Sequence, residues 1–149
     1  MSTSIETMKE VFALNFDRLE TELKAYENES DLWLLKPGIG NSAGTLALHL
    51  CGNAQHFFGA MIGETGYVRD REAEFARRNV PLKEILEEIK AAEKAFEAGM
   101  SKLTEEQLSR PFPVEVFGHP MTYTFFLLRL LGHFDYHLGQ INYHRRLMT

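Results

Sequence analysis

The chain has 149 residues, 44% of them hydrophobic and 25% charged, which is typical of a folded globular protein rather than a disordered or fibrous one. This length suits one domain, so we expect residues 1–149 to form a single domain. A formal net charge of −5 gives no broad positive surface for a phosphate backbone, and a nucleic-acid partner is therefore not expected. Because Cys51 is the only cysteine, an internal disulfide and a cysteine-rich zinc site are both excluded.

The beginning of the chain is polar and acidic, and no stretch approaches the roughly 20 apolar residues of a membrane span. We therefore expect neither a secretory signal nor a contact with the membrane. The expected location is the cytoplasm.

Four segments carry apolar residues at helical spacing, and no long segment shows the alternation of a half-buried strand. The first begins at Thr3 and Glu6, which are in capping-box register, and extends to about residue 26. The second is capped by Asn41 and Ser42 and ends near Gly63. Its inward stripe is predicted to consist of Leu46, His49, Leu50, Asn53, His56 or Phe57, and Ala60.

The third helix is predicted to start after Pro81, and its apolar residues then recur almost every seven positions as far as Leu103, as in a bundle helix. The prolines and glycine between residues 111 and 120 exclude a helix there and indicate a structured connector. The fourth helix is predicted from about Thr122 to Leu147. It is apolar on more than one side, so either it lies at the centre of the bundle or part of it is buried in a homodimer. The pattern predicts an all-α four-helix bundle with long connections.

A segment with alternating charges, residues 67–79, precedes the third helix. Its arginines are Arg69, Arg71, Arg77 and Arg78, and its acidic residues are Asp70, Glu72 and Glu74. The arginines could hold an anionic cosubstrate near the mouth of a site. We favour a solvated charged face with intrahelical ion pairs, because the acidic residues offset the arginines.

Five of the six histidines fall in two predicted helices: His49, His56, His133, His137 and His144. His133 and His137 are one helical turn apart, so their imidazoles should lie side by side on one face. His49 lies in the apolar stripe of the second helix and can supply a third donor. Three neutral imidazoles suit one divalent ion of zinc, nickel, copper or iron, and they leave coordination positions open as in catalytic sites.

The alternative is that these histidines are hydrogen-bonded core residues that bind no metal. His56 and His144 lie seven residues beyond two of the candidate ligands and could form a second polar layer if the helices run parallel; we favour polar packing or a surface position for both. Asn53 and Gln140 are candidates to orient a ligand or a bound molecule, and His56 is a further candidate for the pocket. Cys51 should face away from the site.

Two stretches of the chain, residues 41–53 and 132–141, carry a family resemblance. The second contains His-x-x-x-His followed by Gly-Gln, and the first supplies a histidine in the second helix. On these residues the chain resembles the DinB-like superfamily of four-helix-bundle metalloenzymes, which includes bacillithiol and mycothiol S-transferases. The resemblance implies one metal ion, often nickel or zinc, on a three-histidine set that maps onto His49, His133 and His137.

We thus expect a metal-dependent transferase, similar to the thiol S-transferases, or a hydrolase. Its expected partner is a small molecule, and a low-molecular-weight thiol is one candidate. The alternative is a non-catalytic, metal-dependent sensor or stress-response binding module. A third interpretation, a metal-free helical interaction domain, holds only if the three histidines do not converge.

Overall fold

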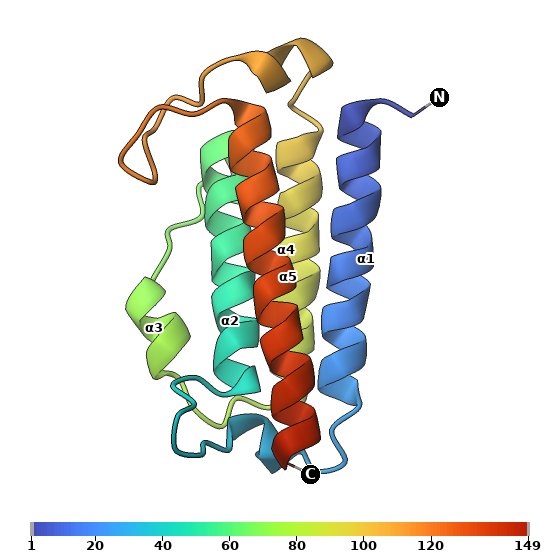
Figure 1. Cartoon of the computed structure of the whole chain (residues 1–149), viewed down its shortest axis with the longest axis vertical. Coiled ribbons are helices and arrows are strands. Elements are labelled where there is room, and N and C mark those ends of the chain that lie inside the picture. Colours follow the sequence, from blue (N-terminus) through green and yellow to red (C-terminus); the bar gives the residue numbers. More distant parts are fainter. Residues whose placement is uncertain (1, 149) are drawn as a thin grey trace.

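Four long helices form the bundle in the computed structural model, which describes residues 2–148 and confirms the all-α prediction (Figure 1). These helices are α1 (Ser4–Lys24), α2 (Ala43–Ala54) with its continuation η2 (Gln55–Ile62), α4 (Leu82–Met100) and α5 (Tyr123–Met148). Three short helices lie in the connections: η1 (Glu29–Trp33), α3 (Arg71–Ala76) and η3 (Glu105–Ser109). In the described part of the chain, no helix is both long enough and apolar enough to cross a membrane.

The direction of the helices decides which residues meet. Helices α1 and α5 run one way through the bundle, and α2 and α4 run the other way (Figure 1). Helix α2 contacts both α4 and α5, and α3 packs against the outside of α2. The middle of α2 therefore faces the middle of antiparallel α5 on one side and the short helix α3 on another.

The beginnings of α1 and α2 follow from their sequences. The Thr3 side chain accepts a hydrogen bond from the Glu6 amide while Glu6 accepts one from the Thr3 amide, which is the predicted capping box. Ser42 caps α2 by accepting a hydrogen bond from the Thr45 amide. These caps fix the ends of two helices that line the core.

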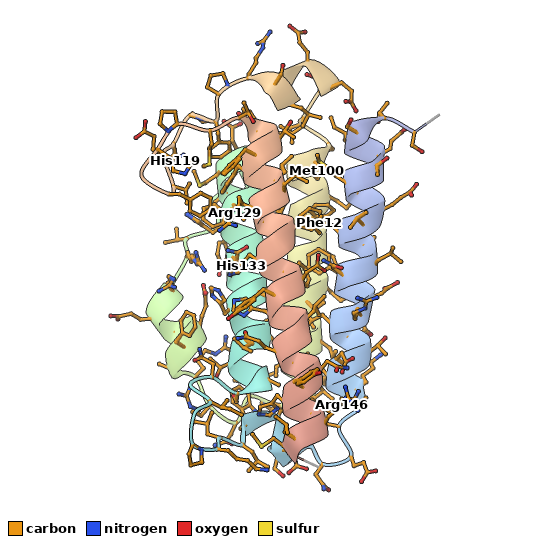
Figure 2. All side chains as sticks on the ribbon, in the orientation of Figure 1. Phe12, Met100, His119, Arg129, His133 and Arg146 are labelled. Atoms are coloured by element: carbon orange, nitrogen blue, oxygen red, sulfur yellow. The ribbon has the colours of Figure 1, made fainter. Side chains whose placement is uncertain are left out.

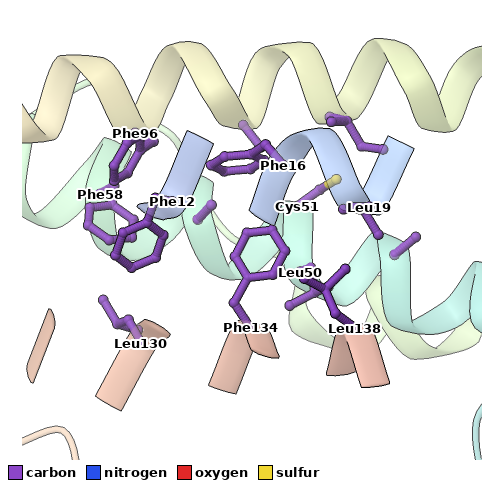
Figure 3. Close-up of a cluster of buried hydrophobic side chains, with 14 of the residues drawn as sticks. Phe12, Phe16, Leu19, Leu50, Cys51, Phe58, Phe96, Leu130, Phe134 and Leu138 are labelled. Carbon is purple, nitrogen blue, oxygen red and sulfur yellow. The ribbon is translucent and has the colours of Figure 1, made fainter. Parts of the chain in front are cut away.

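Aromatic side chains from all four long helices fill the core (Figure 3). The ring centroids of Phe12 and Phe96 are 4.9 Å apart, and those of Phe16 and Phe134 are 5.1 Å apart. Phe58 packs edge-on against Phe96 at 4.8 Å. These contacts join α1, η2, α4 and α5, so the face of α5 that carries Phe134 is held in a fixed rotation about the helix axis.

The second helix changes its winding at Gln55, where the α-helix becomes the π-helix η2. Its last hydrogen bond runs from the Gly63 amide to the Phe58 carbonyl, five residues back. The stripe predicted with regular spacing is therefore wrong beyond Ala54: Phe58 is buried, whereas His56 and Ala60 are only partly buried. A side chain at Gly99 of α4 would overlap the Phe58 carbonyl, so the wide turn of η2 lies directly against the α4 backbone.

The antiparallel arrangement separates His56 from His144, so the second polar layer considered for parallel helices does not form. His144 is buried, and its Nε2–H donates to the Leu34 carbonyl at 2.8 Å. The Tyr26 hydroxyl donates a hydrogen bond to Nδ1 of His144 at 2.6 Å. This network ties the connection after α1 to the end of α5, and it accounts for His144 as a structural residue.

Replacing Tyr26 by phenylalanine should lower the free energy of unfolding by about 1–3 kcal/mol, because Nδ1 of buried His144 loses its hydrogen-bond donor. The control is Tyr143→Phe on the exposed face of α5, which should change stability by less than about 0.5 kcal/mol. Urea unfolding of both variants measures the difference. Equal effects would contradict the role given to the Tyr26–His144 pair.

Candidate metal centre

Three imidazoles converge between α2 and α5, those of His49, His133 and His137. The Nε2 of His133 lies 3.0 Å from Nε2 of His49 and 3.2 Å from Nε2 of His137. One nitrogen of each ring lies within 4.8 Å of the others. His49 is buried, and the other two are partly buried, so the group can be reached from solvent on the α5 side.

Hydrogen bonds at the far side of two rings fix which nitrogen faces the centre. Nδ1 of His49 donates to Oε1 of Glu74 at 3.0 Å, since a carboxylate can only accept. Nδ1 of His137 donates to the amide oxygen Oε1 of Gln140 at 2.7 Å, because an amide oxygen also accepts and does not donate. In the neutral rings, Nε2 of His49 and Nε2 of His137 therefore carry lone pairs directed at His133.

A single proton on Nε2 of His133 cannot form hydrogen bonds with both facing nitrogens. An Nε2–H on its ring serves one of the two facing lone pairs and leaves the other unpaired. Its Nδ1 is buried and has no hydrogen-bond partner within residues 2–148. Burial, followed by the charges that His137 and His49 can carry, lowers the pKa of His133 to about 4, and burial lowers the pKa of His137 as well. Both rings are therefore neutral near pH 7.

The donor set fits a divalent metal ion. Two nitrogens that each lie about 2.1 Å from one ion are about 3.0–3.4 Å apart for octahedral to tetrahedral angles, and both Nε2–Nε2 separations around His133 fall in this range. Neutral imidazoles with lone pairs facing one point are the ligands that zinc, nickel, copper and iron accept. The three residues can thus hold a metal ion.

Glu74 and Arg69 support the site from behind, a role that the sequence pattern did not predict for either residue. Glu74 is 6% exposed, and its carboxylate receives two hydrogen bonds from Arg69, Nε to Oε2 at 2.8 Å and Nη2 to Oε1 at 2.9 Å. Burial raises the pKa of Glu74, but the hydrogen bonds from His49 and Arg69 outweigh this, so its pKa lies below the usual value. Glu74 therefore stays charged and holds His49 in the tautomer that presents Nε2.

The interpretation of residues 67–79 as a solvated face with intrahelical pairs is therefore wrong for Arg69 and Glu74. Its solvated part holds for Glu72 and Arg78, which are exposed. The expected intrahelical ion pairs do not form among the described residues, and Arg77 pairs instead with Glu88 of α4. Gly52 gives the physical reason, because a side chain at this position of α2 would overlap the Glu74 carboxylate. The glycine lets α3 lie close enough to α2 for Glu74 to reach His49.

A cavity of about 380 Å³ opens beside the histidines. His49, His133 and Asn53 form its polar wall, three arginines stand around it, and its apolar lining consists of Phe57, Val116, Phe117 and Leu130. The loop between η3 and α5, which brings Val116 and Phe117 here, is closed by a hydrogen bond from the Phe112 amide to the Met121 carbonyl at 2.8 Å. Figure 2 shows Arg129 and His133 on the same side of α5.

The other candidate residues from the sequence differ in whether they lie at the site. Asn53 lines the cavity, and Gln140 contacts His137. His56 packs against Phe57, with ring centroids 4.7 Å apart, and is not among the cavity-lining residues in the described part of the chain. Cys51 is buried in the core, where burial raises the pKa of its thiol. The structure thus brings Asn53 and Gln140 to the site but leaves His56 beside it.

The fold and the site together are those of a helical-bundle protein with a candidate three-histidine metal centre. The chain belongs to the DinB superfamily, whose family profile matches residues 6–141. A crystal structure of a DinB-like protein from Bacillus cereus is similar, with a TM-score of 0.75 and 22% sequence identity over 99% of this chain and 94% of that one. At this identity the likeness supports the fold alone. No curated protein matches the chain.

Replacing Glu74 by glutamine should weaken zinc binding roughly 10- to 100-fold, because the neutral amide no longer holds His49 as a carboxylate does and leaves Arg69 without its counter-charge. The matched control is Glu72→Gln on the exposed side of the same short helix. Competition titration against a chromophoric chelator measures both affinities. An affinity as high in Glu74→Gln as in Glu72→Gln would refute the role given to Glu74.

Proposed function

We propose that this protein is a metal-dependent enzyme, a transferase of the thiol S-transferase type or a hydrolase, with His49, His133 and His137 as the ligands of one divalent ion. The observation that carries the proposal is the convergence of three Nε2 atoms beside an open cavity. Membership in the DinB superfamily supports it, since the resemblance implies a nickel or zinc ion on this set. Nickel and zinc both accept three imidazoles.

The chain's own residues suit such chemistry. Glu74 and Gln140 hold two of the imidazoles in the orientation needed for ligation. A divalent ion with open positions supplies a lowered pKa for a water or thiol nucleophile at neutral pH. Asn53 lies on the cavity wall, where its amide can hydrogen-bond to a nucleophile or substrate, and Phe57 and Phe117 give the cavity an apolar wall.

A site with three protein ligands favours turnover over a purely structural ion, which proteins usually surround with four. The cavity beside the histidines has room for a small molecule. These two features favour the enzyme over the alternative of a metal-dependent sensor or stress-response module.

Metal content of single-alanine variants tests the ligand set. The wild-type protein, reconstituted with zinc or nickel and desalted, should retain one ion per chain by elemental analysis. His49→Ala, His133→Ala and His137→Ala should each lose most of it, because two imidazoles rarely retain an ion through desalting. His56→Ala, on the same helical segment but outside the cluster, is the control and should retain the metal.

A wild-type protein that retains no ion would refute the metal centre. Turnover is then measured on the loaded wild type and on His133→Ala, with a low-molecular-weight thiol plus monochlorobimane for transfer and an activated ester for hydrolysis. Metal-dependent turnover of either substrate supports the enzyme. Retained metal without turnover of a broader panel of electrophiles and esters favours the sensor.

We further propose that the chain forms a homodimer through the outer face of α5. Five apolar side chains along this face are about half exposed or more: Phe125, Leu128, Tyr136, Tyr143 and Leu147. They follow one stripe together with Gly132 and Gly139, at which an added side chain would meet nothing. Such a stripe lets two antiparallel copies of α5 approach closely and contact each other through the same surface.

Sedimentation velocity should therefore give a dimer for the wild type and a monomer for Tyr136→Lys, which places a charge in the middle of the stripe. Val68→Lys is the control, since Val68 is 87% exposed and lies outside α5, and it should leave the dimer intact. A wild-type monomer at micromolar concentration would contradict the proposal.

A further inference from the structure

The lining of the cavity beside the candidate metal centre is positively charged. Arg69, Arg71 and Arg129 all line it, and no aspartate or glutamate does so among the described residues. Arg69 is already neutralised, because its guanidinium donates two hydrogen bonds to Glu74. The other two arginines have no such partner: within residues 2–148, neither Arg71 nor Arg129 forms a salt bridge.

Each of the two free guanidinium groups is positioned by an aromatic ring. Arg71 stacks on Phe75 at 5.0 Å from the ring centroid, and Arg129 stacks on Phe117 at 5.7 Å. Stacking holds the plane of the guanidinium while its N–H groups stay free to donate. Both side chains are therefore partly ordered for recognition of an anion, although neither is buried.

The same contacts place the two arginines beside the histidines. The Phe75 ring that carries Arg71 also packs on the His49 ring, with centroids 4.7 Å apart. Arg129 precedes His133 by four residues, one helical turn, and so lies on the same face of α5 (Figure 2). One free guanidinium thus flanks the cluster from α3 and the other from α5.

The remaining walls of the cavity are apolar and come from Phe57, Val116, Phe117 and Leu130. We propose that the cavity binds a small organic acid, with its carboxylate on Arg71 and Arg129 and its apolar body against these side chains. This inference deepens the proposed function, on which it rests for the reaction, because it names the class of substrate or cosubstrate that the site accepts.

The volume of about 380 Å³ sets the size of the acid, since cavities of roughly 300–1,000 Å³ hold small ligands in proteins. A phenyl ring with a short acidic side chain has suitable dimensions and the required polarity. Phenylpropionate is therefore the probe, and phenylpropionamide, which has nearly the same shape and no charge, is its neutral counterpart.

Isothermal titration of the zinc-loaded protein tests the proposal. Wild type should bind phenylpropionate and should bind phenylpropionamide at least about tenfold more weakly, because a hydrogen bond to a charged group is worth more than one to a neutral group. Arg71→Gln and Arg129→Gln should each weaken binding of the acid about tenfold or more, and their effect on the amide should be small. Both arginines are exposed, so circular dichroism should show folded variants.

Arg146→Gln is the matched control, because Arg146 lies on α5, is exposed and stacks on Tyr143 at 5.3 Å, far from the cavity. It should bind phenylpropionate as the wild type does. Equal affinity for acid and amide, unchanged binding by the double variant Arg71→Gln/Arg129→Gln, or no binding of the acid by the wild type would each overturn the inference.

Zinc content measured on the same samples separates the two proposals. Protein that retains zinc but does not distinguish the acid from the amide leaves the metal centre intact and refutes only the acid site. Protein that retains no zinc refutes the proposed function. Arginine-dependent binding of phenylpropionate by that protein would still support the acid site.

Discussion

The central constraint in this structure is the approach of α2 and α5, which places Nε2 of His49 3.0 Å from Nε2 of His133. Two neutral imidazoles whose acceptor nitrogens point at one another repel unless a proton or a cation lies between them. With His137 adding a third nitrogen at 3.2 Å, a single proton is insufficient. The three imidazoles can therefore share a cation, and the surrounding residues hold them in the orientation that this requires.

These supports come from distant parts of the chain. The capped start of α2 and the aromatic core fix the rotation of the helices, so that His49 and His133 face each other. The long connection from η2 to α4 folds back as α3 against α2 and delivers Glu74 through the space left by Gly52. A buried charged pair such as Arg69–Glu74 costs desolvation free energy, and its value here lies in fixing the tautomer of His49.

The helices and all three histidines could be predicted from the sequence, His133 and His137 from their local spacing and His49 from its place in the apolar stripe of the second helix. The capping box at Thr3 and the four-residue interval between His133 and His137 are properties of a single helix. Arg69 and Glu74 were missed because alternating charges in a short segment look the same whether they face solvent or a histidine 25 residues away. The π-helix η2 was missed because regular spacing was assumed where Phe58 packs against Gly99.

A crystal of the protein loaded with nickel, with diffraction recorded at the nickel absorption edge, tests the central claim most directly. We expect one anomalous peak per chain between α2 and α5, about 2.1 Å from the Nε2 atoms of His49, His133 and His137. A nickel peak elsewhere on the chain would contradict this claim. So would the absence of any peak among the three imidazoles.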